Sequence, residues 1–157
     1  DSMGTGSVLR YGDVQRMSAG TGVSHSEFNH SPTEPVHFLQ IWLFPDTQNI
    51  APSYQETHFS PDAKRNQLRL IASPDGADGS LLIHQDARIY ATILEGSERL
   101  THVLADGRGA YVQVARGRLQ VNGITLEAGD ALQASEETVL TLENGQDAEV
   151  LVFDLPL

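Results

Sequence analysis

The chain alternates between short runs of strand-forming residues and recurrent turn signals. Gly-Asp, Asp-Gly and Asn-Gly pairs recur along it, and the runs between them are rich in Val, Ile, Leu and Tyr. The runs on either side of Asn122-Gly123 predict a hairpin, because this pair readily supplies the positive φ angles of a type I′ turn. Residues 139–142 and 149–154 predict further strands. Since no segment carries a long helical period, the pattern predicts an all-β antiparallel sandwich or barrel.

Residues 36–44 are apolar at nearly every position. Alternate side chains of a strand face opposite sides, and here both sides would carry large apolar groups. One set is Val36, Phe38, Trp42 and Phe44, and the other is Leu39, Ile41 and Leu43. We therefore expect a strand that is buried on both faces.

An internal repeat relates residues 6–18 to residues 123–135. Aligned without gaps, both copies share a glycine, a leucine, a Gly-Asp turn and a serine at the same places. Much strand-forming sequence precedes the second copy, so we expect two related barrels, the first without its front half. The N-terminus lacks the features of a signal peptide and does not begin with Met. The chain is therefore expected to be a processed product or a trimmed piece.

Composition narrows the classes of function. The 157 residues suffice for one ordinary domain or two small ones. With 10 Lys and Arg against 21 Asp and Glu, the net charge of −11 disfavours direct binding of nucleic acid. No apolar run approaches the roughly 20 residues of a membrane span, so no membrane association is expected. Cysteine is absent, which excludes thiolate chemistry and fits a cytoplasmic protein.

His25 and Glu27 stand two residues apart, behind the glycine-rich turn at residues 20–22. On an extended strand, the two side chains would project to the same side. An imidazole with a carboxylate suits a divalent transition metal such as iron, manganese, nickel, copper or zinc, but a complete site takes three or four protein ligands. The pair therefore predicts half of a metal site. In the register of the repeat, Leu142 and Asn144 take its places, so the second copy has no such pair.

A family resemblance rests on several of these stretches. Gly12, Gly20, His25 and Asn29 stand in the order of the second cupin motif. The sequence from Met17 to Asn29, followed by residues 37–45, closely resembles the pirin family. Three further stretches resemble the pirin-like bacterial quercetinases, namely residues 78–81, 84–86 and 151–156.

The resemblance implies a bicupin. In that family the N-terminal barrel binds one metal, usually iron, through three histidines and a glutamate, and the C-terminal barrel is generally metal-free. The third histidine and the glutamate fall on His25 and Glu27, while the other two ligands form a His-x-His pair that would lie before Asp1. Residues 1–45 are then the C-terminal half of the metal-binding cupin, and residues 46–157 are the metal-free cupin.

The resemblance also implies a function. The intact parent is expected to be a quercetin 2,3-dioxygenase, an oxidoreductase that acts on flavonols or related catechols, with Glu27 as both metal ligand and catalytic base. Without the upstream histidines, this chain is expected to be inactive alone. The alternative is a non-enzymatic cupin module for interaction or regulation, as implied by the redox-sensitive co-regulator role of the animal member. Unpaired strand edges predict a homodimer or a complementing N-terminal segment that covers residues 1–45.

The other candidate residues are expected to have structural roles. His37 lies on the Leu39 face of its segment and is expected in the core or behind a ligand. Trp42 and Tyr54 could line a flavonoid pocket, although aromatic residues on apolar strands usually belong to the core. The histidines of the second unit are expected to be ordinary polar residues without a carboxylate-rich surrounding, namely His58, His84 and His102.

Overall fold

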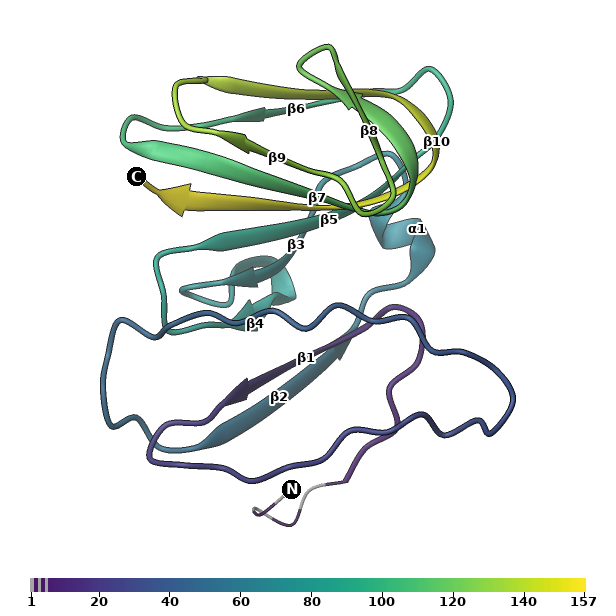
Figure 1. Ribbon diagram of the computed structural model, residues 1–157. Coiled ribbons are helices and arrows are strands. Elements are labelled where there is room, and N and C mark those ends of the chain that lie inside the picture. The colour runs from purple at the N-terminus through teal and green to yellow at the C-terminus, as the bar shows by residue number, and fades with distance from the viewer. Residues whose placement is uncertain (1, 3, 5) are drawn as a thin grey trace.

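A computed structural model describes residues 2, 4 and 6–157, and within them the chain is almost entirely β-structure (Figure 1). The helical elements are the single turn α1 (Pro61–Lys64) and the short η1 (Ala77–Gly79). The all-β prediction is therefore confirmed. The strands are β1 (Asp13–Ser18), β2 (Ser53–His58), β3 (Arg69–Ser73), β4 (Leu81–Leu82), β5 (Arg88–Leu94), β6 (Arg99–Val103), β7 (Arg108–Val121), β8 (Ile124–Glu127), β9 (Ala131–Ala134) and β10 (Val139–Pro156).

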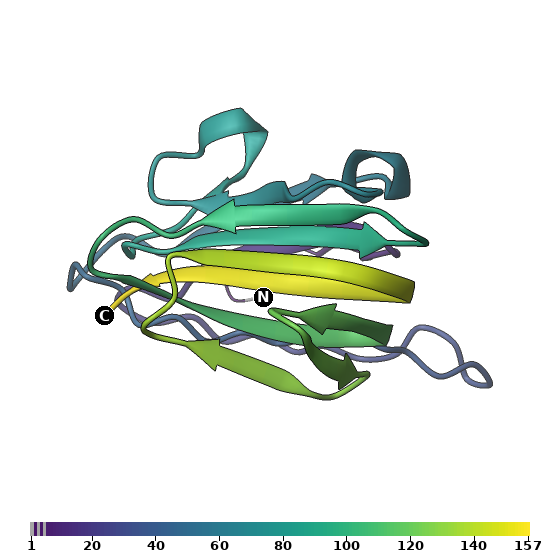
Figure 2. The same ribbon diagram turned by 90° about the horizontal axis from the view of Figure 1, so that it is seen from above.

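The larger sheet is built around β10. Its strand order is β4-β3-β5-β10-β7-β8, with β6 on β10 and β9 on β7. The first part of β10 pairs with β6 and the last part with β5, while β7 follows it along both parts. Irregular pairing between Glu143 and Glu149 joins the two parts, so the strands predicted at 139–142 and 149–154 are the two ends of one long strand. Figure 2 shows the paired strands from above.

Apolar side chains fill the inside of this sheet. Along β10, alternate residues face inward on either side of the irregular stretch, as the strand period requires. Burial of such side chains stabilises the fold by about 25 cal/mol for each Å² removed from water. All buried side chains of this cluster are therefore apolar. The residues with 0% exposure in this cluster are Leu94, Val112, Val114, Val121, Leu140, Leu142, Ala148, Val150 and Val152.

The hairpin predicted around Asn122-Gly123 is confirmed. It joins β7 to β8, with Val121 opposite Ile124. Both turn residues have positive φ angles, 47° at Asn122 and 79° at Gly123. This is the backbone geometry that a two-residue type I′ turn needs.

β1 and β2 form a separate two-stranded ribbon (Figure 1). Directly opposite residues of an antiparallel pair share a face, so Asp13 and Gln15 lie on one face with His58 and Glu56. The other face packs toward the larger sheet, where Val14 contacts its second apolar cluster. This ribbon pairs strands from either side of residue 45, and the division into residues 1–45 and 46–157 stays a prediction.

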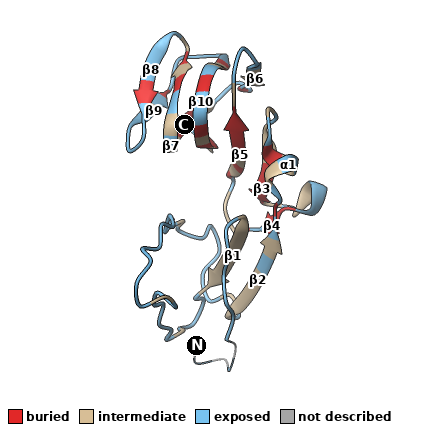
Figure 3. Ribbon diagram, turned by 90° about the vertical axis from the view of Figure 1, so that its right-hand side faces the viewer, coloured by how far each residue is buried: buried red, intermediate tan, exposed pale blue. Residues whose placement is uncertain are grey.

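The prediction of a doubly buried strand at residues 36–44 is wrong. The whole stretch from Ala19 to Pro52 contains no strand, and most of it is exposed (Figure 3). Trp42 and Phe44 are 81% and 83% exposed. A strand needs a partner for its backbone N–H and C=O groups, and within the described residues this segment is paired with none of the strands. Leu43, in contrast, packs against the second cluster. His37 and Trp42, expected in the core, are exposed for the same reason.

Candidate metal centre

The turn before His25 is fixed by glycine. Gly20 has a φ of +52°, and a Cβ atom there would lie 2.0 Å from the carbonyl oxygen of Ile50. Gly22 closes the turn by donating its N–H to the carbonyl of Ala19 at 2.8 Å. Any larger residue at position 20 would collide with the backbone of the returning segment. The sequence thus brings the chain around tightly just before the predicted ligand pair.

His25 and Glu27 lie outside any strand, so the strand geometry considered for the pair is not present. Both side chains are exposed. The N–H of Ser2 donates to the carbonyl of Ser24 at 2.7 Å, and the N–H of Ser24 donates to the Ser2 hydroxyl at 3.1 Å. These two hydrogen bonds hold the segment, which belongs to no strand. The Glu27 carboxylate is held by Gln15 of β1, whose Nε2 donates to its Oε1 atom at 2.7 Å.

The donor types at this position suit a metal, but two donors are not a complete set. Imidazole and carboxylate are normal ligands of a divalent transition metal, and two of them make up half of a four-ligand set. Within the described residues, no three or more His, Asp or Glu side chains gather closely enough to hold an ion. The ligand roles of His25 and Glu27 therefore stay predictions.

The polar face of the β1–β2 ribbon lies behind Glu27. The Tyr54 hydroxyl contacts Glu56 Oε2 at 2.5 Å and Gln15 Oε1 at 3.1 Å. Burial, and then the bond to Glu56, raise the pKa of Tyr54. Tyr54 was expected in the core, but it is half-buried and makes polar contacts. The sequence near Gln15 gives no sign of these contacts, because Glu27 is 12 residues and Tyr54 is 39 residues away along the chain.

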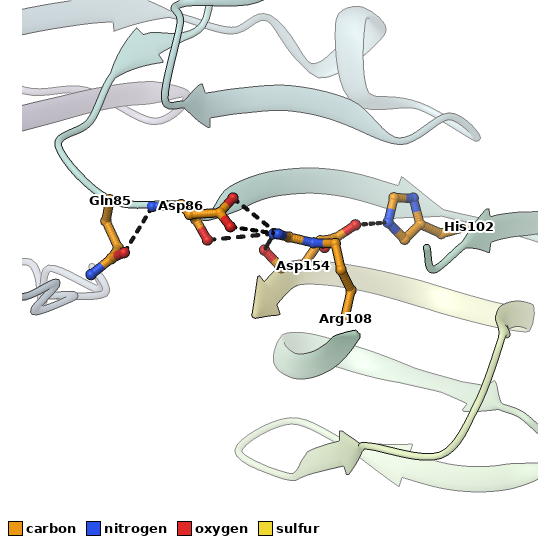
Figure 4. A network of polar contacts seen from close by, with 5 residues as sticks. All are labelled: Gln85, Asp86, His102, Arg108 and Asp154. Atoms are coloured by element: carbon orange, nitrogen blue, oxygen red, sulfur yellow. Dashed lines mark hydrogen bonds and ion pairs between the residues drawn. The ribbon is translucent and has the colours of Figure 1, made fainter. Parts of the chain in front are cut away.

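A second polar network lies at one end of the larger sheet (Figure 4). Arg108 binds both carboxylate oxygens of Asp86, at 2.9 and 3.0 Å, and its Nε and Nη2 groups donate to the side chain and the carbonyl of Asp154. His102 Nε2 lies 2.8 Å from the other Asp154 oxygen. The side chains of Arg108 and Asp154 are only 13% and 7% exposed, so the network is largely removed from water. It joins β6, β7 and β10.

The later histidines are expected to lack a carboxylate-rich surrounding, and two of them have one carboxylate neighbour each. His102 pairs with Asp154, and His58 Nδ1 lies 2.6 Å from Asp13 Oδ1. These pairs span 52 and 45 residues, so neighbouring sequence gives no sign of them. Each involves a single carboxylate, so neither forms a metal cluster. Their chemistry is that of ion pairs and hydrogen bonds that join strands.

An apolar groove of about 320 Å³ runs between residues 39–43 and the strands β7 and β10. Trp42 and Tyr111 are among its aromatic lining, together with Phe153. Tyr111 and Phe153 meet edge to face, with ring centroids 5.8 Å apart. A flat apolar group would fit such a lining better than a charged one.

Two protein families match the sequence. Residues 70–155 match the family described as the quercetinase C-terminal cupin domain, and residues 1–43 match the family described as pirin. A quercetin 2,3-dioxygenase of Escherichia coli K12 is 40% identical over 156 residues, which are 99% of this chain and 66% of that protein. A putative quercetin 2,3-dioxygenase of Pseudomonas aeruginosa is 35% identical, with 99% of this chain and 67% of that protein covered.

Solved structures resemble the whole chain. YhhW from Escherichia coli is 39% identical and superimposes with a TM-score of 0.92, over 99% of this chain and 65% of that one. The bacterial pirin YhhW in complex with nickel(II) gives a TM-score of 0.85, at 39% identity, over 92% of this chain and 62% of that one. The chain thus spans about two thirds of the length of these relatives. Within the described residues, no helix is long and apolar enough to cross a membrane.

Proposed function

The chain belongs to the pirin family, and on that premise we propose that it forms part of a metal-dependent oxygenase of the quercetin 2,3-dioxygenase type. The cupin fold expected from the motif between Gly12 and Asn29 is confirmed by the matching families and solved relatives. The names of those relatives support a small aromatic substrate, a flavonol or a related catechol. Since the chain spans 66% of such a relative, the activity is proposed for the whole protein, and this chain alone is expected to be inactive.

His25 and Glu27 are the residues we assign to the metal. The single observation that carries this assignment is the Glu27 carboxylate held by Gln15 at 2.7 Å, two residues after an imidazole. We propose iron, and the nickel(II) complex of the related YhhW supports a divalent transition metal in this family. When bound, the metal would act as a Lewis acid that lowers the pKa of a substrate hydroxyl.

Glu27 is also the residue we propose as catalytic base. Gln15 holds its Oε1 atom, so Oε2 is the oxygen left to accept a proton from a bound hydroxyl. The tight turn at Gly20 fixes the direction in which the chain enters this segment. A base must lie within hydrogen-bond reach of the proton it removes. The fixed turn and the hydrogen bond from Gln15 would keep the Glu27 carboxylate in one position relative to that proton.

Quercetin turnover by the full-length gene product tests this proposal. The variants are His25→Ala and Glu27→Gln, with Glu34→Gln as the matched control, because Glu34 is an exposed carboxylate in the same stretch. We expect the first two to lose metal content and activity together, and the control to keep both. Undiminished cleavage of quercetin by Glu27→Gln would contradict the assignment.

A second candidate function is an interaction or regulatory module without catalysis. The observation that favours it is the row of exposed apolar side chains at residues 36–44, including Phe38 at 60% exposure. A chain with such a row is expected to bind itself or a complementing segment. The net charge of −11 supports contacts with proteins over direct contacts with nucleic acid, and the cytoplasm stays the predicted compartment.

A further inference from the structure

The Glu27 carboxylate is the end of a row of side-chain hydrogen bonds that starts on the β1–β2 ribbon. Gln15 donates to Glu27 at 2.7 Å, and the Tyr54 hydroxyl lies 3.1 Å from Gln15 Oε1. Tyr54 also lies 2.5 Å from Glu56 Oε2, to which Ser7 donates at 2.7 Å. These hydrogen bonds therefore connect Glu27, which lies outside any helix or strand, to the paired strands β1 and β2.

The register of the ribbon places these side chains together. Gln15 is directly opposite Glu56, and Met17 is opposite Tyr54, so Tyr54 is the diagonal neighbour of Gln15. Diagonal neighbours on one face of an antiparallel pair are within reach when the side chains are long. Gln15 and Tyr54 meet for this reason, on the face turned away from the larger sheet.

The orientation of the Gln15 amide follows from its two partners. An ionised carboxylate only accepts hydrogen bonds, so the amide nitrogen must face Glu27 and the amide oxygen must face Tyr54. The phenol has one proton, and the closer Glu56 carboxylate is its stronger acceptor. The Gln15 amide therefore makes a stronger hydrogen bond through its nitrogen, to Glu27, than through its oxygen, from Tyr54.

We propose that Gln15 is a positioning residue, which holds Oε1 of Glu27 against the ribbon and thereby orients the whole carboxylate. Glu27 belongs to no strand and pairs with no strand among the described residues, so its side chain is not fixed by a ladder there. Gln15 stands on a paired strand, whose ladder with β2 holds its backbone. The hydrogen bond from Gln15 therefore restricts the positions that the Glu27 carboxylate can take. The consequence for a metal rests on the function proposed above.

The first test needs no metal. In this chain, the side-chain NH₂ signals of Gln15 are assigned by nuclear magnetic resonance through their loss in Gln15→Met. We expect these signals to shift in Glu27→Gln, because the amide then donates to a neutral group, and to stay unchanged in the exposed control Glu34→Gln. Tyr54→Phe is expected to move them less. Gln15 signals that do not respond to Glu27→Gln would overturn the proposal.

The second test measures nickel(II) affinity of the full-length gene product by calorimetry. Loss of a partner that orients a ligand typically weakens metal binding by about 10- to 100-fold, and we expect this for Gln15→Met. Gln133→Met is the matched control, because Gln133 is an exposed glutamine on β9, and its affinity is expected to equal that of the wild type. Circular dichroism checks that both variants are folded.

The two tests separate the possible failures. Equal nickel affinity in wild type and a folded Gln15→Met variant would overturn the positioning role. If the wild type binds no nickel, the proposed metal function fails, while the amide signals still decide whether Gln15 holds Glu27. A loss of affinity in Gln15→Met together with shifted amide signals in Glu27→Gln supports the proposal.

Discussion

His58 Nδ1 lies 2.6 Å from Asp13 Oδ1, across the register of the β1–β2 ribbon. The backbone N–H of Arg10 and then the His58 ring hold the pKa of Asp13 below its usual value. A carboxyl whose pKa is lower in the folded state stabilises the fold above its unfolded pKa of about 4, and that stabilisation is lost as the pH falls through the folded pKa.

Asp13→Asn should therefore cost stability at neutral pH and little in acid. We expect a loss of about 1 kcal/mol in the free energy of unfolding at pH 7, since a hydrogen bond to a charged group is removed. The difference from the wild type should shrink below pH 4. Urea unfolding at several pH values measures it, with the exposed Asp106→Asn as control. A difference that is independent of pH would contradict this account.

Asp154→Ala should be among the most destabilising single changes. It would leave Arg108, only 13% exposed, without its buried partner, and removing one member of such a pair costs roughly 3 kcal/mol or more. Arg99→Met is the contrasting change, because Arg99 is 63% exposed where it pairs with Glu143, and exposed pairs contribute at most about 1 kcal/mol. Urea unfolding of both variants should reproduce this order. Equal losses would show that the Asp154 network is not the stronger one.

Gly117→Ala should disrupt the place where β7 crosses the irregular part of β10. Gly117 has a φ of +67°, and a Cβ atom there would lie 2.2 Å from the carbonyl oxygen of Asp147. We expect a loss of about 3 kcal/mol or more from strain and collision. Gly107 has a φ of +76° with open space around it, so Gly107→Ala should cost only about 1–2 kcal/mol. Thermal unfolding compares the two, and similar melting temperatures would count against the collision.

The exposed apolar row at residues 36–44 should drive association. We expect the sedimentation coefficient of this chain to rise with concentration, because Phe38, Trp42 and Phe44 are all at least 60% exposed. The double variant Trp42→Ser, Phe44→Ser should sediment as a monomer. Val103→Ser, which removes an exposed apolar group on β6, should behave as the wild type. A wild type that stays monomeric at every concentration would refute the predicted association.

Local sequence determined much of this protein. The hairpin at Asn122-Gly123 was predictable because turn chemistry acts within a few residues. The all-β architecture followed from short strand-forming runs between turn signals. The family was recognisable from residues 17–29 and the stretches that accompany them, because a tight glycine turn before the predicted ligand pair tolerates few alternatives.

Only the tertiary structure decided the rest, because those features depend on partners far away in the sequence. Residues 36–44 have the composition of a buried strand, yet a strand forms only where another strand pairs with its backbone, and none of the described strands pairs with this segment. The Asp154 contacts span 46 and 52 residues, and those of Gln15 span 12 and 39. Sequence supplied the chemical groups, while strand register determined which of them meet.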